Sequence, residues 1–172
     1  MIETRSDGRD EDVIDEIAGI EPGSRLAELR RQRAEVFRHS QGSHDVLLLP
    51  ADPGSVSRAE RAAIALRVAA AAKDERLAAH YRGLLREAGG EALIAFVEHP
   101  GAGGAPARLA ALLRHADLLA ETPRYAAKAD LEKLEALGLS GRDIVAISQL
   151  IAFVSFQTRV LAGLRILKEE RP

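Results

Sequence analysis

The stretch RAERAAIALRVAAAAKDERLAAHY, from Arg58 to Tyr81, decides the fold of this chain. It is rich in alanine, the residue with the highest helix propensity, and it predicts one long helix that leads to His80. Aromatic residues make up only 3% of the chain, so the core must be built mainly from alanine, leucine, isoleucine and valine. Such small side chains let helices approach one another closely. We therefore expect an all-α fold.

Capping residues give the long helix its bounds. Ser57 is the expected N-cap, and Glu60, three residues later, completes a capping-box pattern. Gly89 and Gly90 end the helix. The prediction is therefore a single helix from 57 to about 88.

Further helices are predicted on both sides of this one, from apolar periodicity and from Ser, Gly and Pro boundaries. They cover residues 12–20, 25–39, 91–98, 107–120, 125–137 and 141–168. The segment 41–56, which contains the apolar run VLLLP, is predicted to be extended and packed over helices. Residues 1–10 are charged and without apolar periodicity, which predicts a disordered tail. The expected organisation is one domain, with N-terminal helices and the extended segment in 11–56 and a helical core in 57–168.

The last predicted helix is apolar around almost its whole circumference, which places it at the centre of the fold or in a subunit interface. Unpaired polar groups are costly in such surroundings. Polar side chains on this helix, and the tyrosine beside His80, are therefore expected to be hydrogen-bonded in the core, to cross an interface, or to face a pocket: Tyr81, Gln149, Gln157 and Arg159.

Composition excludes several functions. The 172 residues include no cysteine, which rules out disulfides, thiolate catalysis and cysteine-bound metals. A net charge of −2 argues against nucleic-acid binding. The polar N-terminus does not have the pattern of a signal peptide, and no run of about 18 apolar residues predicts a membrane span. We expect a cytoplasmic protein.

His80 is the first candidate for chemistry, because an imidazole titrates near neutral pH and can accept or donate a proton. The alternative is a partly buried helix histidine bonded to a neighbour. His39, His44 and His99 lack the i, i+4 helical context of a metal site, so neither a metal nor another cofactor is expected.

Residues 60–90 resemble the core helix of the carboxymuconolactone decarboxylase and alkylhydroperoxidase D superfamily. In that helix an Arg-x-x-x-Ile-Ala-Leu-like pattern is followed by Cys-x-x-Cys-x-x-x-His. By resemblance, His80 falls on the motif histidine, and Lys73 and Arg76 fall on the two cysteine positions. A glutamate that helps to relay protons in the thiol enzymes falls at Arg61 or, with a shift of one residue, at Glu60.

Residues 134–167 are similar to the peroxidase-related branch of the same superfamily. Gly138, Leu139 and Ser140 match the start of its last helix, and Phe156 and Arg159 match a motif within that helix. The resemblance covers roughly residues 55–167. It implies an alkylhydroperoxidase D-like helical bundle that assembles as a homo-oligomer.

The missing thiols decide between the functions that the resemblance implies. Thiol peroxidase chemistry needs a thiolate to attack the peroxide and a second thiol to resolve the product, so this activity is not expected. The first hypothesis is a non-catalytic or partner subunit of a helical oligomer, paired with its own copies or with a thiol-bearing relative.

Two alternatives remain. One is an acid–base enzyme of the decarboxylase type, in which His80 and Glu60 move a proton while Lys73 or Arg76 binds a carboxylate. The other is a small-molecule binding module without chemistry. Against the carboxylate site, the charged run 73–76 is also typical of a solvated turn between two helix segments.

Overall fold

The computed structural model describes residues 12–99 and 103–169, so the predicted tail at 1–10 lies outside the described residues. Throughout the described ranges the only regular elements are helices, which confirms the all-α prediction. They are α1 (Val13–Ala18), α2 (Arg25–Arg31), α3 (Ala34–Leu48), α4 (Arg58–Ala71), α5 (Glu75–Glu87), α6 (Ile94–Glu98), α7 (Ala107–Glu121), α8 (Lys128–Glu135) and α9 (Gly141–Glu169), with 3-10 turns at Glu91–Leu93 and Pro123–Tyr125.

Helix α4 lies at the centre of the fold and packs against α5, α6, α7 and α9. Its middle is buried on every side, including Ala62, Ala63 and Ala65, each no more than 2% exposed. A helix surrounded by neighbours must present short side chains, because the neighbouring backbones come close to its axis. The alanine-rich sequence thus explains why this segment, and not a leucine-rich one, is the core.

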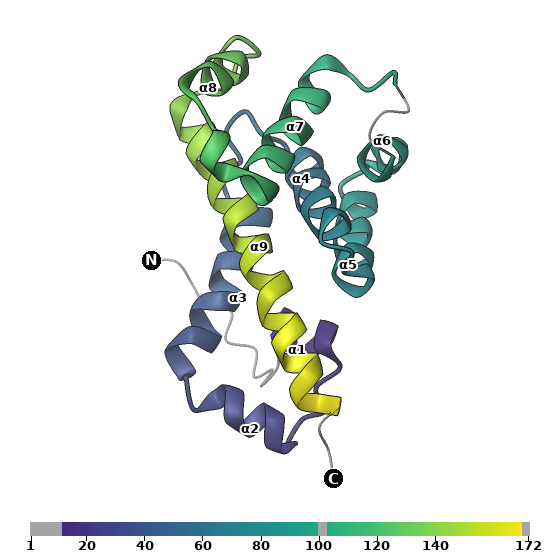
Figure 1. Ribbon diagram of the computed structural model, residues 1–172, viewed down its shortest axis with the longest axis vertical. Coiled ribbons are helices and arrows are strands. Elements are labelled where there is room, and N and C mark those ends of the chain that lie inside the picture. Colours follow the sequence, from purple (N-terminus) through teal and green to yellow (C-terminus); the bar gives the residue numbers. More distant parts are fainter. Residues whose placement is uncertain (1–11, 100–102, 170–172) are drawn as a thin grey trace.

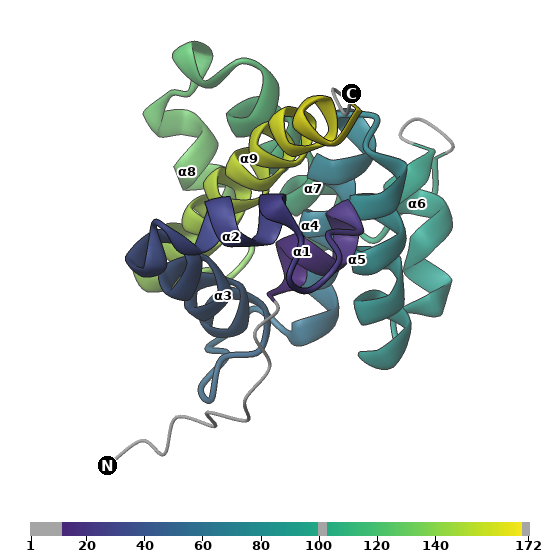
Figure 2. The same ribbon diagram turned by 90° about the horizontal axis from the view of Figure 1, so that it is seen from below.

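Helix α9 is the second organising element and runs along α1, α3, α4, α7 and α8 (Figures 1 and 2). Ser140 and Asp143 form a capping box at its start, with backbone-to-side-chain hydrogen bonds of 3.0 and 3.2 Å. By length and composition α9 could cross a membrane, and 39% of its most apolar window is buried within the fold. Its packing against five other helices is that of a core helix.

The prediction of one helix from 57 to about 88 is wrong, because the chain breaks between α4 and α5. Both the Ser57–Glu60 capping box and the end of α5 before Gly89 are as predicted. At the break, the amide of Lys73 donates to Ala70 O and that of Asp74 donates to Ala69 O, at 3.0 and 3.1 Å. This is a Schellman motif, and it reverses the chain so that α5 packs antiparallel to α4.

Asp74 fixes the second half of the break. Its carboxylate caps α5 by accepting from the amide of Leu77 at 3.1 Å, and it forms a two-point ion pair with Arg165 of α9 at 2.7 and 2.9 Å. The alternative prediction of a solvated turn at 73–76 is right about the break between two helix segments, but the turn lies at 72–74 and residues 75–76 already belong to α5. Asp74 is buried within this turn, whereas Lys73 and Arg76 are exposed.

Lys73 occupies the left-handed position of the Schellman motif, with φ of 57°. Glycine adopts this conformation without the steric cost of a Cβ. Lys73→Gly is expected to raise the free energy of unfolding by about 0.5–1 kcal/mol, measured by urea unfolding. Ala72, at φ −75°, is the control: Ala72→Gly should be neutral or destabilising. Equal destabilisation by both changes would contradict strain at Lys73.

The predicted helix at 25–39 and the extended segment at 41–56 also need correction. The chain ends α2 at Arg31, turns at 32–33, and then continues as one helix through Leu48. Residues 41–48, including most of the VLLLP run, are therefore helical. A short continuous apolar run is compatible with either a strand or a helix. Here the segment is helical and packs against α9 and α4.

Residues 50–57 after α3 form bends and a turn at Gly54, not the predicted extended segment, and are held by charged side chains from three helices. Arg61 of α4 is 4% exposed and donates to the carbonyls of Leu47, Pro53 and Val56 at 2.9–3.1 Å. Arg108 of α7 donates to Ser55 O at 2.7 Å, and Asp143 of α9 accepts from the Ser55 amide and hydroxyl. These contacts pin the connection between α3 and α4 against the core.

Candidate functional site

His80 lies on the second turn of α5 and forms a pair with His44 of α3. Their Nε2 atoms are 3.0 Å apart, and their ring centroids are 5.3 Å apart. His44 is 6% exposed, while His80 is partly buried. The sequence prediction concerned His80 alone, and the fold supplies the second imidazole.

The geometry of the pair is that of a shared hydrogen, not of two ligands on one ion. The ring centroids are 5.3 Å apart and the two Nε2 atoms 3.0 Å, a difference of about two ring radii, so both nitrogens lie close to the line that joins the ring centres. Two imidazoles that coordinate one metal meet at an angle instead, with each nitrogen about 2.0–2.1 Å from the ion. Among the described residues no group of three possible metal ligands occurs. The pair is thus suited to hold and pass a proton.

Tyr81 and Gln157 extend this polar cluster into the core. The Tyr81 hydroxyl donates to Gln157 Oε1 on α9, and both side chains are fully buried. The Tyr81 ring stacks near His44, with centroids 6.5 Å apart, and meets His80 edge-on at 5.1 Å. Side chains from α3, α5 and α9 therefore form one continuous seam: His44, His80, Tyr81 and Gln157.

Two polar atoms near this seam are buried without a hydrogen-bond partner among the described residues. They are Nε2 of Gln157 and Oγ of Ser40, which lies one helical turn before His44 on α3. A buried polar atom without a hydrogen-bond partner lowers the stability of the fold, so such atoms are rare and often lie at functional sites. The hydrogen-bonding capacity of the polar side chains in and beside the seam is therefore not fully used.

Burial sets the protonation of the seam. It lowers the pKa of His80 to about 4, with a further contribution from the positive charge that His44 would carry. Burial also raises the pKa of Tyr81 well above its usual range, although the bond to Gln157 opposes this shift. At neutral pH His80 is an uncharged imidazole and Tyr81 an uncharged phenol, so proton transfer here begins from neutral groups.

Lys73 and Arg76 lie at the exposed break before α5. They line an open pocket of about 540 Å³ together with Asp74, Arg165 and Lys168. The pocket is strongly charged, and its acidic and basic groups partly neutralise one another. The two positions assigned to the family's thiols are thus solvated cations.

Glu60, the second predicted catalytic residue, is engaged at the opposite end of α4. One carboxylate oxygen closes the capping box on Ser57, and the other accepts from Arg108 of α7 at 2.6 Å. Among the described residues, no contact joins Glu60 to His80. Its neighbour Arg61 holds the backbone carbonyls described above.

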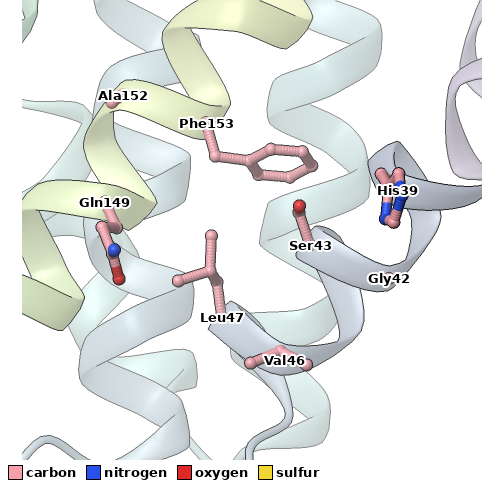
Figure 3. A pocket seen from close by; sticks show the side chains of 8 residues that line it. All are labelled: His39, Gly42, Ser43, Val46, Leu47, Gln149, Ala152 and Phe153. Atoms are coloured by element: carbon pink, nitrogen blue, oxygen red, sulfur yellow. The ribbon is translucent and has the colours of Figure 1, made fainter. Parts of the chain in front are cut away.

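The polar residues predicted on the last helix separate into different roles. Gln157 is in the core seam, whereas Gln149 and Arg159 are exposed, and Arg159 donates to Ser155 O at 2.7 Å. Gln149 lines a groove of about 620 Å³ between α3 and α9. Figure 3 shows Phe153 projecting over Ser43 and Leu47 pointing into the space between the two helices.

Sequence reasoning set His44 aside as a metal ligand and missed its pairing with His80. The prediction of an extended segment from 41 removed the helical spacing that relates His44 to Ser40 and Leu48. With residues 34–48 as a helix, these three residues share one buried face. Predicting a helix through Leu48 would have placed His44 on a buried face. It would not have identified His80 as its partner.

Comparison with known proteins supports the fold. The sequence matches no protein-family model and no curated protein. An uncharacterized peroxidase-related protein from Silicibacter sp. TM1040 superposes with a TM-score of 0.70 at 21% identity, over 80% of this chain and 72% of that one. The alkylhydroperoxidase AhpD core of an uncharacterized peroxidase-related protein from Ralstonia eutropha JMP134 gives 0.70 at 24% identity, over 80% and 73%. The fold is that of these AhpD-like helical proteins.

Proposed function

We propose that this chain, which has the AhpD-like fold of peroxidase-related proteins, is a subunit of a helical oligomer and does not perform thiol chemistry itself. The absence of cysteine supports the second part, because Lys73 and Arg76 cannot replace a peroxide-reducing thiolate. The first part is carried by the outer face of α9, which is apolar yet open.

The open side of α9 is formed by Val145, Gln149, Ala152 and Phe156, spaced four, three and four residues apart and all exposed. Val145 is 57% exposed and Phe156 39%. Beside them Val46 of α3 is 68% exposed at the rim of the groove. A helix that is apolar all round is normally covered all round, so another chain is expected to cover this side.

A second copy of the chain suits this surface. The surface has a groove and projecting apolar side chains next to each other, and a twofold axis would bring the projections of each copy to the groove of the other. The same arrangement would admit a related helical chain that retains the thiol pair. We propose the homo-oligomer as the basic assembly and the thiol-bearing relative as a further partner.

Light scattering on the purified chain tests the assembly. We expect a mass at least twice the 18.5 kDa of one chain, and Val46→Glu is expected to return it to a monomer, because a buried carboxylate is costly. Leu131→Glu, at a 40% exposed position on α8, is the control and should keep the oligomer. A monomeric wild type that also binds no thiol-bearing relative would remove the support for this proposal.

The His44–His80 pair favours a second candidate function, an acid–base site centred on His80. A neutral imidazole with a hydrogen-bonded partner is suited to accept a proton from a substrate. Any turnover found by screening lactone acids should fall by about 100-fold or more in His80→Ala, with folding retained. His39→Gln, which changes a 70% exposed histidine, is the control. Unchanged turnover in His80→Ala would make the histidine structural.

A further inference from the structure

The protonation pattern of the histidine pair follows from its outer partner, Asp45. Asp45 Oδ1 lies 3.2 Å from Nδ1 of His44 and also accepts from Gln41 Nε2 at 2.8 Å. Gln41 is itself held by the amide of Val13, which donates to its Oε1 at 2.9 Å. A carboxylate only accepts hydrogen bonds, so Nδ1 of His44 carries the hydrogen in this contact.

This assignment fixes His80 as well. With its hydrogen on Nδ1, a neutral His44 presents a lone pair at Nε2. The 3.0 Å bond between the two Nε2 atoms then needs its hydrogen on His80. Nδ1 of His80 is left as the lone-pair nitrogen, and among the described residues it has no hydrogen-bond partner.

We infer that Asp45, His44 and His80 form a proton relay, in which Nδ1 of His80 is the basic atom and the carboxylate of Asp45 is the outlet to solvent. The Asp45 side chain is 56% exposed, so its oxygens exchange protons with water. His44, which lies between Asp45 and His80, is buried. His44 and Asp45 are positioning residues, and only His80 would touch a substrate.

The proton balance of one passage closes within these three groups. A proton leaves an acidic C–H or O–H of the substrate and binds Nδ1 of His80, and the electron pair stays on the substrate. The hydrogen on Nε2 of His80 moves to Nε2 of His44, and the hydrogen on Nδ1 of His44 moves to Asp45. Asp45 becomes neutral and then releases the proton to water, so both imidazoles remain uncharged throughout.

The relay rests on the second proposed function, but its tautomers can be measured without a substrate. Nitrogen-15 NMR of the histidine rings near neutral pH is expected to show a hydrogen on Nε2 and a lone pair on Nδ1 for His80, and the reverse for His44. A hydrogen on Nδ1 of His80 would overturn the assignment. Failure to find turnover would count against the proposed acid–base function and leave the tautomer result intact.

A matched pair of variants tests the role of Asp45. Asp45→Ala is expected to change the ring nitrogen shifts of both His44 and His80, because His44 loses the acceptor that holds its tautomer. Glu35→Ala is the control, since Glu35 is an exposed carboxylate that contacts His39 on the same helix at 3.2 Å. It should change only His39. If Asp45→Ala changed His44 but left His80 as in the wild type, the two rings would not be linked and the relay would be refuted.

Discussion

Replacing Arg61 with methionine is expected to lower the free energy of unfolding by about 3 kcal/mol, the largest single effect among the side chains considered. Arg61 is 4% exposed and donates to three backbone carbonyls at 2.9–3.1 Å. Methionine fills a similar volume but leaves those carbonyls without their donor, one of them buried and two partly buried. The desolvation that lowers the pKa of Arg61 opposes part of this loss, because methionine carries no charge to bury.

Urea unfolding measures this effect, and the neighbouring turn of α4 provides the control. Arg58 is exposed at the first residue of the helix, so Arg58→Met should change stability by less than about 0.5 kcal/mol. Arg61→Lys should lie between the two, since an ammonium group cannot reach three carbonyls in the fixed fork of a guanidinium. Similar values for Arg61→Met and Arg58→Met would show that the connection between α3 and α4 does not depend on Arg61.

Acidification is expected to destabilise the fold through His80. Its pKa falls from 6.5 to about 4 on folding, so the unfolded chain binds the proton more readily between these values. The contribution of His80 to the free energy of unfolding is therefore fully present above pH 6.5 and is lost as the pH falls toward 4. This loss is about 3 kcal/mol at most. Burial also lowers the pKa of His115, which adds to the loss with the same sign.

Unfolding free energies measured across this pH range isolate the part due to His80. His80→Gln keeps an amide that can bond to Nε2 of His44 but does not titrate, so its pH slope should be clearly smaller than that of the wild type. His39→Gln, which removes a 70% exposed histidine on α3, is the control. An equal slope in wild type and His80→Gln would mean that His80 titrates normally in the folded chain.

Much of the fold could be predicted because local chemistry specifies it. Ser57 and Glu60 can close a capping box from neighbouring residues alone, and the start of α9 is fixed in the same way by Ser140. The break at Lys73 was harder to predict. Alanine and lysine favour a continuous helix, and the reversal is stabilised by a contact 91 residues away, between Asp74 and Arg165. Periodicity gives no information about a partner at that distance.

The candidate site shows the same division. His80 was identified by its type and by resemblance, whereas His44 and Gln157 join it from elements 36 and 76 residues distant from their partners. Glu60 was assigned to the site by resemblance, with a shift of one residue, yet it lies at the start of α4 and accepts a hydrogen bond from Arg108. Sequence spacing places residues on one helix, but only packing places two helices against each other.

By itself the stretch from Arg58 to Tyr81 determined that the chain is helical, that its centre is built on alanine, and that a peroxidase thiol is absent. These properties depend on residue type and on neighbours within a turn or two. Only the tertiary structure decided that the stretch folds back on itself, that Lys73 and Arg76 face solvent, and that His80 meets His44. Those outcomes depend on which side chains, distant in sequence, pack together and exclude water, and local sequence patterns do not specify these partners.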